Sequence, residues 1–250
     1  MPALSNPSLR RSVRSASLVV VAVAAALVHD SMASGGQVKG RIDGQEGLIP
    51  AVFVESARLD SHRFTWREPS PTVRAEFRAL TANPSRDVCI AALSTTPPPP
   101  HDPILVRITG GRTLPTTLVI APGVRLSFEN HDPFPHRLFM VGSNTWKAET
   151  IEPNRHREWS APPGQGRFEI RDELFPSVRS FVVVDPGVVD VAYPGHDGAF
   201  AFQDLPAGDY VLKAFFQGKP VGKPVSVSVK GNSLVDLKDP LNVAADGAGQ

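Results

Sequence analysis

Two histidines and a distant aspartate provide the clearest candidate chemistry in this sequence. His131 and His136 lie in the proline-containing stretch "NHDPFPHRLF", and Asp172 lies in the later stretch "RDELFPSVRS". Imidazole and carboxylate groups together suit a divalent cation, so His136, His131 and Asp172 form one candidate metal site. The spacing does not require a metal, and we favour His136 as a structural histidine whose ring is hydrogen-bonded within the fold.

The single cysteine is a second candidate group. Cys89 lies in the apolar run "DVCIAAL", 47 residues before His136. A free cysteine in such surroundings behaves mostly as a small buried hydrophobe. We therefore expect an inert buried thiol rather than a metal ligand, and no disulfide can form within the chain.

Motifs of the common catalytic classes are missing from the sequence. It contains no G-x-S-x-G elbow, no H-E-x-x-H pair, no Walker loop and no dinucleotide fingerprint. The neighbouring carboxylates Asp172 and Glu173 would face opposite sides of a strand and could not share a substrate. We predict a protein without catalytic activity. Hydrolysis or isomerisation of a sugar is kept as an alternative, because sandwich domains often accompany such enzymes.

The elements that position these residues are predicted to be short strands. Apolar residues alternate or cluster in runs such as "ILVRIT", "VRLSFEN", "SFVVV" and "DYVLKAFF", each bounded by turn residues. Turn signals that recur about every 8 to 12 residues are typical of antiparallel sandwiches and barrels. The chain is therefore predicted to be all-β. Residues 71–82 alone have helical spacing and predict a short surface helix.

The first 33 residues have the features of a secretory signal. Three arginines precede an apolar run over residues 16–28, and small residues surround an expected cleavage point near Ala33. The apolar run is shorter than the roughly 20 residues of a membrane-spanning helix, although a retained anchor is the alternative. We expect a periplasmic or secreted protein with no stable membrane anchor.

The charge balance gives no electrostatic reason to expect a nucleic acid as partner. The formal net charge of the whole chain is +1. The predicted signal contains three arginines and one aspartate, so its removal leaves a net charge of −1. Binding of a phosphate backbone normally depends on an excess of basic residues.

Residues 104–186 resemble the cupredoxin family. The matching stretches are "TLVIAPGVRLSFENHDPFPHRLF" and "PPGQGRFEIRDELFPSVRSFVVV". The resemblance implies a Greek-key barrel with His136 at one end. In copper-binding members that histidine is joined by a Cys, a His and a Met from the loop before the last strand.

Counted back from "SFVVV", these three ligand places fall near Asp172, Phe175 and Val178 in this sequence. None of the three supplies the soft donor that a type 1 copper site needs. The resemblance therefore implies a barrel that has lost this site and holds no cofactor. Copper bound through His136 remains the alternative.

The two ends of the chain resemble a second family. "GHDGAFAFQDLPAGDYVLKAFFQGKPVG", from Gly195, resembles the transthyretin-like (prealbumin-like) or carboxypeptidase-regulatory-like β-sandwich. "GQVKGRIDGQEGLIPAVFVESA", from Gly36, resembles the first two strands of the same module, with Ala51–Val54 as its second strand. The resemblance implies one sandwich divided in sequence by the inserted barrel.

These readings divide the chain into six segments. They are the signal (1–33), the first sandwich strands (36–58), an irregular segment with a proline-rich linker (59–103), the barrel (104–186), the remaining sandwich (187–240) and a disordered tail (241–250).

The whole arrangement resembles exported methylamine-utilisation-type cupredoxin proteins. We predict an exported, non-catalytic binding or structural protein whose partner is a protein or glycan at the cell envelope. A copper or other divalent-cation binding protein that uses His136, for delivery or electron transfer, is the second hypothesis. Aromatic side chains that could contact a partner, or could instead fill the cores, are Phe134, Trp146, Phe215 and Phe216.

Overall fold

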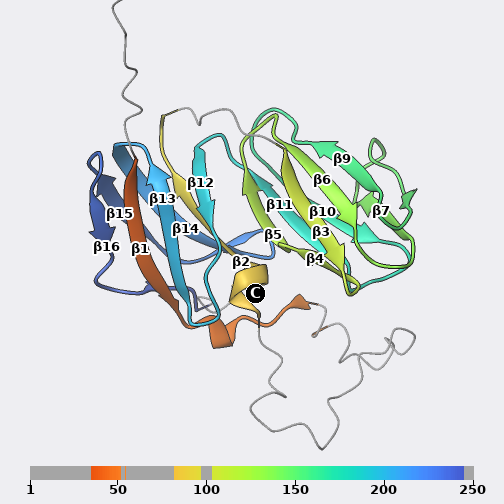
Figure 1. Cartoon of the computed structure of the whole chain (residues 1–250), viewed down its shortest axis with the longest axis horizontal. Helices are drawn as coiled ribbons and strands as arrows, with labels where there is room; N and C mark the ends of the chain where they lie inside the picture. The colour runs from red at the N-terminus through yellow and green to blue at the C-terminus, as the bar shows by residue number, and fades with distance from the viewer. Residues whose placement is uncertain (1–34, 52–53, 55–81, 97–102, 245–250) are drawn as a thin grey trace, which may run out of the picture. The chain divides into compact units, whose positions relative to one another are not determined.

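The protein is described by a computed structural model, in which the described residues are 35–51, 54, 82–96 and 103–244. Strands make up most of these residues (Figure 1). The helical elements with defined bounds are a short 3-10 helix, η1 (Gln45–Gly47), and the single-turn helix α2 (Pro84–Asp87). The prediction of an all-β fold is confirmed. Within the described ranges, no helix combines the length and the apolar character needed to cross a membrane.

Nine strands form two sheets over residues 104–184, which we call the barrel sheets. One has the strand order β5-β11-β10-β7-β8 and the other has the order β4-β3-β6-β9. The strands are β3 (Ile104–Thr109), β4 (Arg112–Leu114), β5 (Thr117–Ile120), β6 (Arg125–Asn130), β7 (His136–Met140), β8 (Glu149–Ile151), β9 (His156–Ser160), β10 (Gly166–Asp172) and β11 (Arg179–Val184).

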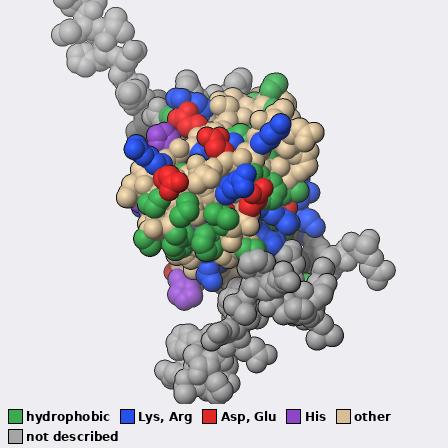
Figure 2. All heavy atoms as spheres, turned by 90° about the vertical axis from the view of Figure 1, so that its right-hand side faces the viewer, with side chains coloured by type: hydrophobic (Ala, Val, Ile, Leu, Met, Phe, Trp, Pro, Cys, Tyr) green, Lys and Arg blue, Asp and Glu red, His purple; other side chains and the backbone are tan. Residues whose placement is uncertain are grey.

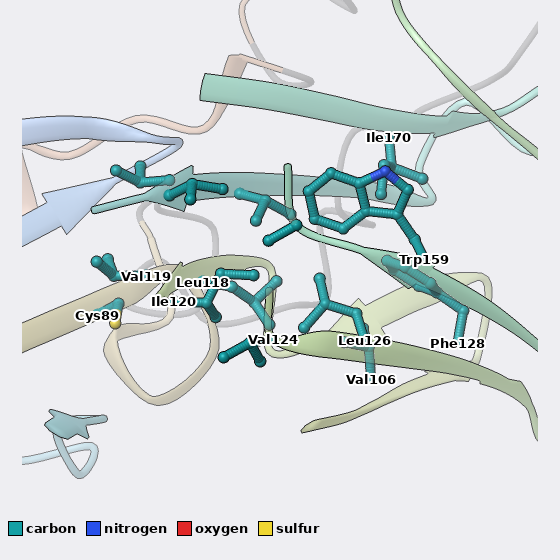
Figure 3. Packing of buried hydrophobic residues seen from close by; sticks show 14 of the residues in the cluster. Cys89, Val106, Leu118, Val119, Ile120, Val124, Leu126, Phe128, Trp159 and Ile170 are labelled. Atoms are coloured by element: carbon teal, nitrogen blue, oxygen red, sulfur yellow. The ribbon is translucent and has the colours of Figure 1, made fainter. Parts of the chain in front are cut away.

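Alternation along the barrel strands explains which side chains fill the space between them. Val106 and Ile108 on β3 are fully buried, whereas the residues between and beside them are exposed. Phe128 on β6 is also fully buried, and Trp159 on β9 is nearly so. Figure 3 shows Phe128, Trp159 and Ile170 packed together at one end of this core.

Eight further strands form a second pair of sheets, which we call the sandwich sheets. One has the order β13-β1-β16, with β17 also paired to β1, and the other has the order β12-β2-β14-β15. The strands are β1 (Gly36–Asp43), β2 (Val88–Leu93), β12 (Val188–Ala192), β13 (Ala199–Leu205), β14 (Gly208–Phe216), β15 (Lys219–Val229), β16 (Leu234–Asp236) and β17 (Leu241–Asn242).

Strands from both ends of the described chain lie in one sandwich sheet. β1 pairs antiparallel with β13, placing Gly40 opposite Phe200. A Cβ on Gly40 would come within 2.7 Å of the Phe200 ring, so the close approach requires glycine here. The antiparallel ladder thus joins segments that the barrel separates in sequence. Whether this sandwich is transthyretin-like stays a prediction.

The segment assigned as irregular, 59–103, contains α2 and the central strand β2. β2 pairs with β14 on one side and with β12 on the other. Its first five residues are buried, so it has no alternation of apolar and polar residues to reveal it. The assignment was therefore wrong for residues 84–93.

At the ends of two predicted segments the structure differs from the prediction. Ala51 and Val54, expected in a strand, are helical, and the residues between them lie outside the described residues. In the predicted disordered tail, β17 pairs with β1 and Leu241 is fully buried, so that prediction was wrong up to residue 244. The buried apolar residues of this segment are Leu241 and Val243, and two positions are too few to form a recognisable strand pattern. The signal, the prolines 97–100 and all but the last residue of the helix predicted at 71–82 lie outside the described residues.

β2 is shared by two hydrophobic cores. Cys89 and Ala91 belong to the barrel core, whereas Val88, Ile90 and Ala92 belong to the sandwich core. Figure 3 shows Cys89 beside Val119 of β5, at the end of the cluster away from Phe128. Successive side chains of a strand point to opposite faces, so one strand completes both cores.

Candidate functional site

The ring of His136 lies between two buried carboxylates. Its Nδ1 is 2.5 Å from Oδ2 of Asp172, and its Nε2 is 3.0 Å from Oδ2 of Asp132. His136 is fully buried, and Asp132 and Asp172 are 5% and 4% exposed. Both ring nitrogens therefore already have a hydrogen-bond partner.

The turn between β3 and β4 holds Asp132 in place. The backbone N–H groups of Gly110 and Gly111 donate to its two carboxylate oxygens, over 2.6 and 2.9 Å. Both glycines have positive φ angles, 59° and 67°, which glycine adopts without strain. The backbone N–H of Asp132 donates to Oδ1 of Asn130 at 2.9 Å. These hydrogen bonds hold the Asp132 side chain in one orientation.

The loop between β10 and β11 holds Asp172 in the same way. Its Oδ1 accepts hydrogen bonds from the backbone N–H groups of Arg137 at 3.1 Å and Leu174 at 2.7 Å. Its Oδ2 faces His136. Each oxygen of this carboxylate has a separate partner, so the side chain has little freedom to turn towards another ligand.

Two phenylalanine rings pack against the imidazole. The ring centroids of Phe134 and Phe175 lie 5.3 and 5.2 Å from that of His136, and 4.6 Å from each other. Both phenylalanines are half-buried. This apolar contact excludes water from the histidine and strengthens its interactions with the carboxylates.

The electrostatics favour an ion triad. Burial opposes a charged His136, but the hydrogen bonds and charges of Asp172 and Asp132 outweigh it, and the pKa of His136 is raised above 6.5. Burial similarly opposes charged carboxylates. Hydrogen bonds from Gly111, Gly110 and His136 nevertheless lower the pKa of Asp132 below 3.8. The pKa of Asp172 is lowered because hydrogen bonds from His136 and backbone amides outweigh its burial.

The structure brings together two of the three predicted metal ligands. His136 contacts Asp172, but the side chain of His131 is 47% exposed and its Nε2 lies 3.2 Å from Oε2 of Glu129. In the part of the chain that the structure describes, no group of three His, Cys, Asp or Glu residues has an arrangement that could hold a metal ion. The proposed use of these residues as ligands stays a prediction.

Sequence reasoning missed Asp132. It lies four residues before His136, in a turn that contains Pro133 and Pro135. A turn has no periodicity from which side-chain direction can be inferred. The available signal was chemical, since an aspartate near the predicted buried histidine is a natural ion partner.

The donor set does not fit a type 1 copper ion. Of the three positions matched to copper ligands, Asp172 supplies a hard carboxylate, while Phe175 and Val178 supply no donor atom. The only thiol, Cys89, is fully buried on β2, where burial raises its pKa to about 12. The Cys89 thiol lies within hydrogen-bond reach of the Tyr193 side chain and the Val119 backbone. The described site therefore contains no thiolate that could bind a copper ion together with His136.

The aromatic candidates pack within the fold. Phe215 lies in the barrel core and Phe216 in the sandwich core. The guanidinium carbon Cζ of Arg157 lies 3.7 Å from the centroid of the Trp146 ring. The centroids of the Trp146 and Phe128 rings are 5.9 Å apart. These contacts match the interpretation in which the aromatic side chains fill the cores.

Comparison with known proteins gives a similarity in structure. No family model matches the sequence, and no curated protein matches it. Amicyanin from Paracoccus versutus is 18% identical over 38% of this chain and 97% of its own, with a TM-score of 0.31. A Cu(I) form of an amicyanin variant aligns over 38% of this chain and 98% of its own, with the same identity and TM-score.

Proposed function

We propose that this protein is an exported, non-catalytic binding or structural protein with a cupredoxin-like barrel that lacks the type 1 copper ligands. The observation that supports this most directly is the His136 ring, both of whose nitrogens face carboxylates. A metal would have to displace one of these partners before it could bind the ring.

The His136 triad has a structural role in this proposal. It connects the glycine turn after β3, the turn before β7 and the loop after β10, through hydrogen bonds to Asp132 and Asp172. An imidazolium between two carboxylates can hold these three loops at the end of the barrel, as a metal ion would. Loss of one partner from such a buried pair leaves an uncompensated charge, which is strongly destabilising.

The same contacts favour a role without catalysis. General acid–base catalysis needs a group within hydrogen-bond reach of the substrate proton. Asp132 and Asp172 instead face His136 and backbone amides, and both are almost fully buried. A sugar hydrolase would also need space for substrate between its carboxylates, whereas the imidazole lies between these two.

The mixed charges on one face of the protein support a protein or glycan partner rather than a nucleic acid. On the face shown in Figure 2, acidic and basic side chains lie interspersed, and hydrophobic side chains gather in the lower half. Such a distribution lacks the single-sign field that draws a phosphate backbone.

A metal titration tests the proposal. The mature protein would receive one equivalent of Cu(II) and, separately, Zn(II), followed by measurement of bound metal after gel filtration and of the visible spectrum. We expect the wild type to bind no more metal than His136→Asn. His131→Asn is the matched control for a histidine outside the triad. Tight binding that His136→Asn abolishes, or an intense thiolate-to-copper band, would overturn the proposal in favour of the metal-binding hypothesis.

Export is tested by fractionation of cells that express the full chain. We expect the protein outside the cytoplasm, with its N-terminus near residue 34 because of cleavage after Ala33. An intact N-terminus with the protein bound to membranes would show that the segment is a retained anchor.

A further inference from the structure

A basic groove lies on the outer face of β10 and β11. It has a volume of about 1030 Å³. It is lined by residues 47–49, by the hairpin between β14 and β15 and by Phe181 of β11. This volume is at the upper end of the range for small-molecule sites. The groove uses none of the three residues of the His136 triad.

Basic residues dominate the polar lining of the groove. They are Arg167, Arg171, Arg179 and Lys219, and Glu169 is the one acidic residue that lines it. Glu169 already accepts a hydrogen bond from Nε of Arg171 at 2.6 Å. Arg179 is buried, and its Nε donates to the backbone carbonyl of Pro176. Glu169 is thus engaged by Arg171, and the exposed cations of the groove are Arg167 and Lys219.

Two of these cations are placed to receive a ligand. Arg167 and Lys219 are exposed, and neither forms an ion pair with another residue that the structure describes. The hairpin tip approaches Arg167, because a Cβ built on Gly218 would lie 3.9 Å from its Nε and 3.3 Å from Cβ of Phe181. Lys219 follows Gly218 directly. The hairpin turn next to Lys219 thus lies close to Arg167 and Phe181, and all three residues line the groove.

The hairpin that carries Lys219 has a tight two-residue turn. Gln217 and Gly218 both have positive φ angles, 49° and 71°, as a two-residue type I′ turn requires. Oε1 of Gln217 accepts a hydrogen bond from the backbone N–H of Ala51 at 3.2 Å. This bond connects the hairpin to the opposite segment of the groove wall, so the basic end is preformed.

Apolar side chains extend from the basic end. Phe181 is half-buried, while Ile49 and Val141 are 53% and 43% exposed. Large apolar side chains exposed together in a concave surface are typical of ligand sites. A purely polar anion would leave this apolar surface in contact with water.

We propose that this groove binds a linear anionic amphiphile, such as a medium-chain fatty acid. The carboxylate lies between the guanidinium of Arg167 and the ammonium of Lys219, and the alkyl chain covers Phe181. This inference rests on the binding role proposed above and names a ligand class for it. The site lies in a different part of the protein from the His136 triad.

Calorimetry with dodecanoate, below its critical micelle concentration, tests the inference on the mature full-length protein. We expect one molecule bound per chain and clearly weaker binding of dodecanol, acetate and dodecyltrimethylammonium. The double variant Arg167→Gln, Lys219→Gln should weaken binding about tenfold or more, because two charge-assisted contacts are lost. The matched double variant Arg125→Gln, Lys230→Gln, outside the groove, should bind as the wild type does. Circular dichroism checks that every variant is folded.

The results separate this inference from the proposed function. Absence of dodecanoate binding, equal binding of the cationic amphiphile, or no effect of the groove variant would each overturn the groove assignment while leaving the metal result unaffected. Weaker binding caused equally by the control variant would show adsorption through net charge and would also overturn it. Metal binding at His136 would overturn the proposed function but not the groove.

Discussion

His136 and Asp172 are 36 residues apart in sequence, yet their Nδ1 and Oδ2 atoms lie 2.5 Å apart inside the barrel, where the two residues are 0% and 4% exposed. A contact of this kind is a charge-assisted hydrogen bond in surroundings that exclude water. The stability of the barrel end should therefore depend on both partners.

Replacement of Asp172 by Asn should destabilise the protein strongly. The amide keeps the shape but removes the charge that His136 requires, and removal of one partner from a buried pair typically costs about 3–5 kcal/mol. Urea unfolding followed by tryptophan fluorescence measures the change. Glu129→Gln, which affects the exposed His131 pair, is the control and should change the free energy of unfolding by less than about 1 kcal/mol. Equal effects of the two variants would contradict the structural role of the triad.

The stability that the triad provides should depend on pH in both directions. The pKa of His136 is raised above 6.5, so its contribution is present below that pH and is lost as pH rises through the folded value. The pKa values of Asp132 and Asp172 are lowered below 3.8, so their contribution is present above that pH and is lost as pH falls through the folded values. The contribution should be greatest between about pH 4 and pH 6.5.

Unfolding free energies at several pH values test this dependence. The difference between the wild type and His136→Asn should be largest inside that window and should decrease on both sides. NMR titration of the imidazole carbon-bound protons would give the pKa directly. A His136 that titrates below 6.5 would contradict the ion triad.

Cys89 should not react with thiol reagents in the folded protein. It is fully buried, and burial raises its pKa to about 12, so almost no thiolate exists at neutral pH. Labelling with Ellman's reagent should be slow in buffer and complete in denaturant. Rapid labelling in buffer would show that β2 opens locally or that the thiol is accessible.

Ile90→Ala should destabilise the barrel as well as the sandwich. Ile90 packs in the sandwich core, while its neighbours Cys89 and Ala91 on the same strand pack in the barrel core. Loss of a buried isoleucine side chain typically costs about 2–5 kcal/mol. Hydrogen exchange with mass spectrometry should show reduced protection in β6 and β14 together.

A matched substitution in the barrel core provides the control for this shared strand. Ile170→Ala, on β10, should also reduce protection in both pairs of sheets if the two cores unfold as one unit. Reduced protection in β14 alone for Ile90→Ala, and in β6 alone for Ile170→Ala, would instead show two independent folding units.

Strands with one buried face could be predicted well from sequence. In β3 and β13 the apolar positions alternate, and the structure confirms both as strands. β2 was assigned to an irregular segment because a strand buried on both faces has no polar positions to mark its period. β17 was assigned to a tail because its two residues carry no pattern, although pairing with β1 buries Leu241.

The sequence by itself determined the all-β class, the candidate importance of His136 and Asp172, and the lack of a soft donor in the loop after β10. These follow from residue type and from alternation, which are local properties. Tertiary structure decided that His131 turns to Glu129, that Asp132 completes the histidine's partners and that β2 serves two cores. Such choices depend on how distant loops and sheets close on one another, because a side chain's partners inside a protein are set by packing rather than by its position along the chain.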